Sequence, residues 1–132
     1  MDHEYISEWF NHGDMDFQAA ELLLASYPLL LEIICYHCQQ AAEKYLKGYL
    51  AFTSKTERPR THDLVLLLAE CMKSDERFND IQRACAVLTR YGVQPRYPNE
   101  MEINEDEMHN AVMYMRKIRN IEPLIELRNM IM

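Results

Sequence analysis

The middle of the clearest helical pattern in the chain reads Cys38-Gln39-Gln40-Ala41-Ala42-Glu43-Lys44-Tyr45-Leu46-Lys47-Gly48. Apolar residues recur through and beyond this stretch at steps of three or four, which is the spacing of one face of an α-helix. They form one continuous stripe: Leu30, Ile34, Cys38, Ala41, Tyr45 and Tyr49. The stripe predicts a helix from about Leu29 to Phe52 that buries one of its sides.

The other side of this predicted helix carries four long polar side chains within two turns: Gln40, Glu43, Lys44 and Lys47. Glu43 and Lys47 form an i,i+4 pair in the favourable order, which is worth roughly 0.2–0.5 kcal/mol on a helix surface. One interpretation is therefore an ordinary solvated face, because exposed ion pairs are common and weak. The alternative is one half of a binding site, which requires other polar groups to converge on it.

Four more amphipathic segments flank this helix along the chain. Their apolar spacing predicts helices at about 6–25, 64–73, 77–90 and 105–121, with a short turn or helix after Pro123. The segment from Leu64 is apolar nearly all round at its start, so we expect it to be deeply buried. Thr61 is expected to cap it, with Asp63 in its first turn at the positive end of the helix dipole.

No strand pattern competes with these helices. The 132 residues, 48% hydrophobic and 27% charged, suit one globular domain, and the low content of three Gly and five Pro favours helices. We therefore expect an all-α fold: an antiparallel up-down helical bundle of four long helices plus a shorter C-terminal helix. We expect this bundle to form a single domain over residues 1–132.

The formal net charge is −7, and a field of that sign repels nucleic acid and anionic membranes. We therefore expect no DNA partner, and any binding of a nucleotide or RNA would have to come from a local basic patch. No apolar run reaches the ~18 residues that span a bilayer, and no leader pattern is visible, so we expect a cytoplasmic protein without a membrane partner. The four cysteines are then expected to be free thiols. Cys35 and Cys38 have no second pair at metal-ligand spacing, so neither a metal site nor a cofactor is predicted.

Two further groups of residues offer to complete a site with the polar side of the long helix. His62, in Thr61-His62-Asp63-Leu64, lies at a predicted helix start, where backbone N–H groups favour anions and the neutral imidazole. Its alternative role is part of a cap that bonds to a neighbouring helix. Arg96 and Tyr97, before Pro98, offer a guanidinium for phosphate and a ring for stacking. Alternatively, Arg96 pairs with a helix glutamate and fixes its loop.

Three segments resemble the motifs of the HEPN (higher eukaryotes and prokaryotes nucleotide-binding) domain family, in the same order and at similar spacing. They are Cys35-Tyr36-His37-Cys38-Gln39-Gln40-Ala41-Ala42-Glu43-Lys44-Tyr45-Leu46-Lys47, Arg60-Thr61-His62-Asp63-Leu64 and Arg96-Tyr97-Pro98. The resemblance implies a four- or five-helix bundle that is usually a homodimer. It also implies frequent partnership with a minimal nucleotidyltransferase in a toxin–antitoxin-like pair.

Many members of that family are RNases whose hallmark is an Arg and a His separated by four to six residues. This sequence departs from that pattern, because Arg58 and Arg60 precede His62 with only three residues and one residue between. No Arg stands at that spacing upstream of the other histidines. The sequence therefore favours a non-catalytic member and identifies no catalytic residue, with His62 as the candidate if one exists.

The predicted function is binding of a nucleotide or RNA phosphate in a groove built from these three segments. Phosphate would contact Lys44, Lys47 and Arg96, and a base would stack on Tyr97. Gln40 and Glu43 would position these groups. His62 would donate a hydrogen bond to the ligand. One alternative is a protein-interaction or dimerisation module that uses the acidic run 100–107 and the Met-rich last helix. Another is a metal-independent RNase that uses His62 with Arg58 or Arg96.

Overall fold

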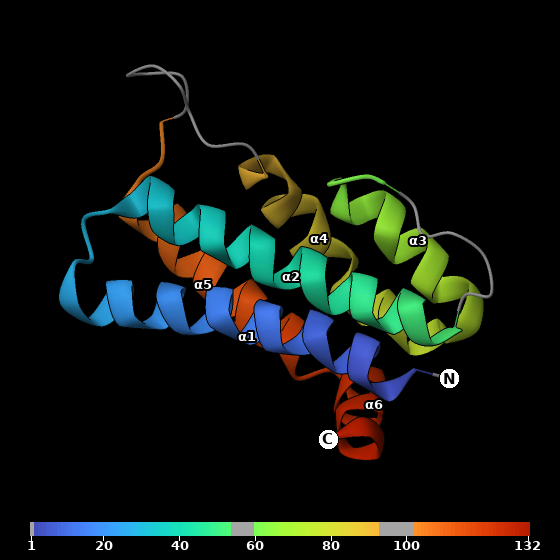
Figure 1. Ribbon diagram of the computed structural model, residues 1–132. Coiled ribbons are helices and arrows are strands. Elements are labelled where there is room, and N and C mark those ends of the chain that lie inside the picture. Colours follow the sequence, from blue (N-terminus) through green and yellow to red (C-terminus); the bar gives the residue numbers. More distant parts are fainter. Residues whose placement is uncertain (1, 54–59, 93–101) are drawn as a thin grey trace.

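The computed structural model describes residues 2–53, 60–92 and 102–132 (Figure 1). Within these ranges the α-helices are α1 (His3–Ser26), α2 (Leu31–Thr53), α3 (Leu64–Ser74), α4 (Gln82–Leu88), α5 (Glu105–Arg119) and α6 (Glu122–Ile131). Two short 3-10 helices, η1 (Glu76–Ile81) and η2 (Thr89–Tyr91), flank α4. The described ranges contain no strand, and the predicted all-α helical bundle is confirmed.

Helix α2 is the centre of the bundle. Figure 1 shows α1 running antiparallel beside it, and α2 also packs against α3, α4 and α5. The predicted stripe is buried at Ile34, Cys38, Ala41, Tyr45 and Tyr49. Leu30 precedes the helix and remains 42% exposed. Because several helices cover α2, it also buries side chains outside the stripe, including Cys35, Ala42 and Leu46.

Two glycines allow α1 and α2 to approach closely. A Cβ atom on Gly13 would lie only 2.7 Å from Cε1 of Tyr45, closer than real Cβ atoms come to any neighbour. On α2, a Cβ on Gly48 would lie 3.1 Å from Cβ of Trp9 and 3.2 Å from Cε2 of Phe10. The absence of a side chain at both positions brings the two helices together, so that their outward-facing residues share one surface.

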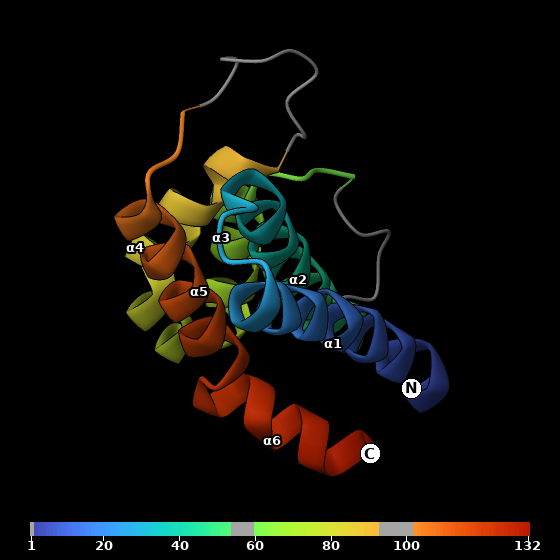
Figure 2. The same ribbon diagram turned by 90° about the vertical axis from the view of Figure 1, so that its left-hand side faces the viewer.

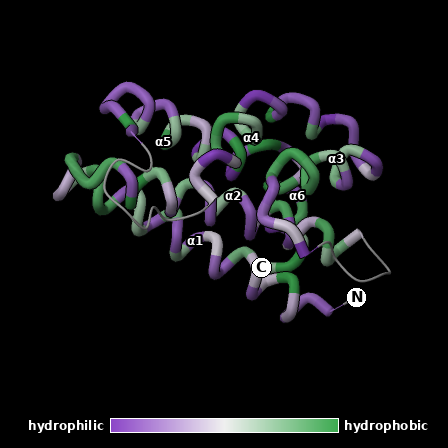
Figure 3. The backbone as a smooth tube through the Cα atoms, turned by 90° about the horizontal axis from the view of Figure 1, so that it is seen from above, coloured by the Kyte–Doolittle hydropathy of each residue, from purple (hydrophilic) through white to green (hydrophobic). Residues whose placement is uncertain are grey.

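Helix α6 lies beyond the other helices and runs across them (Figures 1 and 2). It begins with Pro123 in its first turn, which suits the fixed backbone angle of proline. Leu124 and Leu127 are buried against the bundle, whereas Ile125 is 37% exposed. Figure 3 shows hydrophilic and hydrophobic stretches alternating along the helices, as expected where each helix buries one side.

The start of α3 differs from the sequence-based expectation. Val65 and Leu66 are 44% and 56% exposed, because α3 packs with only one side on the bundle. Its N-cap is Asp63, whose carboxylate accepts a hydrogen bond from the backbone N–H of Val65 at 2.9 Å. Thr61 instead accepts from the backbone N–H of Asp63 at 3.0 Å. The prediction of a deeply buried helix start capped by Thr61 was therefore wrong.

The helix expected at 77–90 is a chain of three short helices, with α-helical geometry only in α4. Asp75 separates η1 from α3, because its side chain accepts the N–H of Arg77 and so caps a new helix. At the last helix, α5 ends at Arg119 rather than at residue 121, and the chain turns into α6.

All four cysteines are free and buried, as predicted. Burial raises the pKa of Cys35 and of Cys85 to about 12, so neither thiol is activated. Within the described ranges, no group of three or more His, Cys, Asp or Glu side chains is placed to hold a metal ion. No helix in the same ranges is long and apolar enough to cross a bilayer.

Candidate functional site

The polar side of α2 carries a hydrogen-bonded group centred on Glu43, here called the Glu43 network. The Glu43 side chain accepts hydrogen bonds from Nζ of Lys47 at 3.0 Å and from Nε2 of Gln39 at 3.1 Å. Both of its oxygens also lie within 3.1 Å of Nδ1 of His62. Burial alone would raise the pKa of Glu43, but the hydrogen bonds from Lys47, Gln39 and His62 outweigh it and hold that pKa below its usual value. The structure therefore brings two predicted site residues, Lys47 and His62, together around the ionised carboxylate of a third, Glu43.

His62 is held from two directions by the Glu43 network. Its backbone carbonyl accepts a hydrogen bond from Nε2 of Gln39 at 3.0 Å, and Gln40 Nε2 donates to Oε1 of Gln39 at 2.7 Å. The His62 side chain is nevertheless 74% exposed. With hydrogen on Nδ1 facing Glu43, the neutral ring presents Nε2 as an acceptor, and the protonated ring presents a donor.

Lys44 belongs to a second group, here called the Asp16 network, which joins α1 to α2. Lys44 Nζ donates to one oxygen of Asp16, and Nδ1 of His37 lies 2.9 Å from the other oxygen. Asp16 is only 8% exposed. Burial would raise the pKa of Asp16, but hydrogen bonds from His37 and Lys44 outweigh it, so the pKa is lowered. The structure thus separates Lys44 from Lys47 and gives each its own carboxylate.

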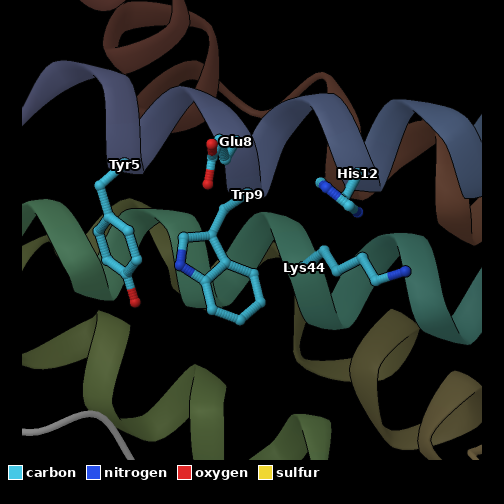
Figure 4. Close-up of a pocket in the computed structure, with 5 residues that line it drawn as sticks. All are labelled: Tyr5, Glu8, Trp9, His12 and Lys44. Atoms are coloured by element: carbon cyan, nitrogen blue, oxygen red, sulfur yellow. The ribbon is translucent and has the colours of Figure 1, made fainter.

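A cavity of about 240 Å³ opens between α1 and α2 beside these networks, and is here called the α1–α2 cavity. Its lining residues are Tyr5, Glu8, Trp9, His12 and Lys44 (Figure 4). Trp9 connects the cavity to the Glu43 network through Lys47. Nζ of Lys47 lies 5.9 Å from the centroid of the Trp9 ring, within cation–π range. Lys44 relates it to the Asp16 network. The cavity therefore borders both networks.

Of the predicted site residues, Gln40, Glu43, Lys44, Lys47 and His62 lie in these two networks, whereas Arg96 and Tyr97 lie outside the described ranges. The sequence-based site missed Gln39 and Asp16. Asp16 interrupts the buried face of α1, between Gly13 and Ala20, and Gln39 interrupts that of α2. A polar residue on an otherwise apolar face is the signal that could have found both, since such a side chain needs a buried partner.

Comparison with known proteins identifies one family and, among solved structures, similar folds that include the two described here. The HEPN domain family model matches residues 6–125. The crystal structure of TT1696 from Thermus thermophilus superposes with a TM-score of 0.71 and 22% identity, covering 94% of this chain and 96% of that one. The structure of ST0689, described as an archaeal HEPN homologue, gives a TM-score of 0.67 and 21% identity, with 96% and 98% covered. No curated protein matches the sequence. At these identities the solved structures support the fold alone.

Proposed function

This chain belongs to the HEPN domain family, and we propose that it binds a phosphate-bearing ligand, a nucleotide or RNA, on the surface shared by α1 and α2. The observation that carries the proposal is that Trp9 contacts one lysine of α2 and shares its cavity with another. Lys47 lies over its ring and Lys44 lines the same cavity. An aromatic ring beside one ammonium group, with a second lysine in the same cavity lining, suits a base or sugar next to a phosphate.

The carboxylates beside the lysines support this proposal rather than oppose it. An ammonium group has three hydrogen-bond donors, and each lysine contributes a bond to one carboxylate, so donors remain for a phosphate. The side chains of Lys44 and Lys47 are only 24% and 11% exposed, and their carboxylate partners fix where the charges stand. Holding the cations in place in advance reduces the ordering cost of binding. His62, fixed by Glu43 and exposed, adds a third nitrogen donor when it is protonated.

Isothermal titration calorimetry with ADP, ATP and a short single-stranded RNA tests the proposal. Lys44→Ala and Lys47→Ala should each weaken binding by roughly ten- to a hundredfold, since a hydrogen bond to a charged group is worth about 1.5–3 kcal/mol. The matched control is Lys73→Ala, because Lys73 also pairs with a carboxylate, Glu70 at 2.9 Å, but lines no part of the cavity. Absence of binding by the wild type would refute the function. Equal binding by all three variants would show that the ligand binds elsewhere.

A second candidate is a protein-interaction module, and a group of exposed apolar side chains favours it. Five of them lie at or near the turn that joins the end of α1 to the start of α2, with 41% to 74% of their surface exposed: Leu22, Tyr27, Leu29, Leu30 and Ile33. Patches of this kind mark interaction sites in many soluble proteins. On the Met-rich last helices, Met113 and Met130 are also 58% and 49% exposed, whereas Met108 and Met115 are buried.

The partners proposed for this module are a second copy of the chain or a minimal nucleotidyltransferase in a toxin–antitoxin-like pair. Light scattering after size exclusion, on the chain alone and mixed with a purified neighbouring nucleotidyltransferase, distinguishes these partners. A monomer in both samples would reject the module.

A metal-independent RNase would use His62 as its base, and the contact between His62 and Glu43 is the observation in its favour. A carboxylate that contacts Nδ1 of a largely exposed imidazole is an arrangement suited to proton transfer. In an RNA cleavage assay, His62→Gln should then abolish activity and Glu43→Gln should reduce it. Robust cleavage by His62→Gln would reject His62 as the base.

A further inference from the structure

The α1–α2 cavity has two chemically different ends. At one end, the rings of Tyr5 and Trp9 lie edge to face, with centroids 6.4 Å apart and an angle of 84° between their planes. Figure 4 shows His12 and Lys44 at the other end, with the lysine chain directed away from Trp9. A ligand lying along the cavity would therefore meet aromatic surface first and nitrogen donors next. A nucleotide has this same order of groups, with a flat base at one end and phosphate at the other.

Glu8 adds a negatively charged hydrogen-bond acceptor to the aromatic end of the cavity. It comes from the same helix as Tyr5 and Trp9, and Figure 4 shows its carboxylate close to Trp9 in the view and away from the Lys44 amine. An ionised carboxylate only accepts hydrogen bonds, so it selects for a base edge that donates them. It would repel a phosphate, whereas at the opposite end the carboxylate of Asp16 is already paired with Lys44 and His37. The phosphate is therefore placed beside Lys44.

Guanine is the base whose edge matches one carboxylate best. Its N1–H and its N2 amino group are adjacent donors that can reach the two oxygens of Glu8 together, as the parallel N–H groups of a guanidinium do. Adenine and cytosine place an acceptor nitrogen beside their amino group, so the second carboxylate oxygen meets a lone pair. Uracil places its one N–H between two acceptor oxygens.

We propose that the α1–α2 cavity binds a single guanine nucleotide, with the base against Trp9 and Tyr5, its N1–H and N2 amino group donating to Glu8, and its phosphate at Lys44 and His12. This assignment rests on the phosphate binding proposed above and narrows it. Lys44 contacts the phosphate, whereas Lys47, which lies over the Trp9 ring, is at the end that holds the base. The volume of about 240 Å³ lies below the roughly 300–1,000 Å³ of drug-sized pockets, which suits one base and its sugar with the phosphate at the opening.

Tryptophan fluorescence measures this binding directly, because Trp9 is the only tryptophan in the chain and it lines the cavity. Titrations with GMP, IMP, AMP and ribose 5-phosphate separate the base from the phosphate. IMP is the informative ligand, since it keeps N1–H and lacks only the N2 amino group. We expect GMP to quench Trp9 and to bind roughly tenfold more tightly than IMP or AMP, because it makes one more hydrogen bond to a charged acceptor.

Two variants complete the test. Glu8→Gln should lower the affinity for GMP to that for IMP and leave the affinity for ribose 5-phosphate unchanged. The matched control is Glu4→Gln, one turn earlier on the same exposed surface of α1 and outside the cavity lining, which should leave all affinities unchanged. Both side chains are exposed, so thermal unfolding should confirm that both variants fold as the wild type does.

The outcomes distinguish this inference from the function on which it rests. Equal affinity of the wild type for GMP, IMP and AMP, or an undiminished GMP preference in Glu8→Gln, would overturn the guanine assignment while leaving phosphate binding intact. Failure of every nucleotide and of ribose 5-phosphate to bind would overturn both. A GMP preference that Glu8→Gln abolishes and Glu4→Gln preserves would support both.

Discussion

Replacing Glu43 by glutamine should destabilise the fold far more than replacing an equally close but exposed glutamate. Glu43 is 5% exposed, and the side chains of its ion pair with Lys47 are 7% and 11% exposed. Breaking a buried pair from one side costs about 3–5 kcal/mol, because the remaining charge loses its partner. Glutamine keeps one acceptor oxygen for Gln39, and the contact to the exposed His62 adds little. We therefore expect a loss of about 2–3 kcal/mol for Glu43→Gln.

Glu70 supplies the matched control. It pairs with Lys73 at 2.9 Å, against 3.0 Å for Glu43 and Lys47, but the side chains of this pair are 43% and 70% exposed. Exposed pairs of this kind are worth about 0–1 kcal/mol, so Glu70→Gln should cost less than about 0.5 kcal/mol. The two ion pairs have similar lengths but differ in burial, so the difference between the two variants measures the contribution of burial together with that of the added partners of Glu43, Gln39 and His62.

Urea unfolding, followed by circular dichroism at neutral and acid pH, measures the free energy of unfolding of the wild type and of both variants. The pKa of Glu43 is below its usual value of 4.5 in the folded protein, so the stability it contributes is complete above that value. It is lost as the pH falls through the folded-state pKa, because the proton then binds to the carboxylate. The gap between wild type and Glu43→Gln should therefore narrow in acid. If Glu43→Gln lost no more unfolding free energy than Glu70→Gln, the buried ion pair of Glu43 and Lys47 would not stabilise the fold as argued here.

Three further substitutions test other parts of the fold, each by thermal or urea unfolding. Asp16→Asn should cost about 1–3 kcal/mol, because it leaves the ammonium of Lys44 beside a neutral partner; an unchanged midpoint would contradict the Asp16 network. Gly13→Ala should destabilise by about 1–2 kcal/mol, since the collision with the fully buried Tyr45 outweighs the better helix propensity of alanine; a stabilised variant would show that Tyr45 can shift. Arg128→Met should leave stability unchanged or raised, because no described residue accepts hydrogen bonds from the buried Nε and Nη2; a loss above about 2 kcal/mol would show that its contacts with aromatic rings dominate.

The helices could be predicted from the sequence because their signals are local. The stripe on α2 repeats every three or four residues, and burial followed it at every position inside the helix. The exposed start of α3 could not be predicted, since an apolar sequence does not reveal which of its sides will meet another helix. Val65 and Leu66 look like core residues until the packing of α3 is known.

The sequence indicated which residue types gather on the polar side of α2, but it did not indicate which side chains bond to one another. The run of polar residues on α2 indicated which side of the helix carries the hydrogen-bonded networks, because a helix places residues three and four apart together. Lys44 bonds to Asp16, 28 residues away, and His62 bonds to Glu43, 19 residues away. Both contacts depend on how helices and turns come together, which no periodicity records. The four polar residues of α2 looked like one cluster in the sequence. In the structure Lys44 belongs to the Asp16 network, and the other three belong to the Glu43 network.

The division into two networks bears on which phosphate ligand fits the chain. Each network contains one carboxylate, one ammonium and one imidazole, so neither holds a large excess of positive charge. The whole chain carries a net charge of −7, which repels a long polyanion. Binding of the proposed ligand would then depend on short-range contacts with the ring of Trp9 and with hydrogen-bond donors held in place, within a cavity of about 240 Å³. These conditions favour a single nucleotide, with its flat base and few charges, over an extended RNA whose affinity would rest on many phosphates.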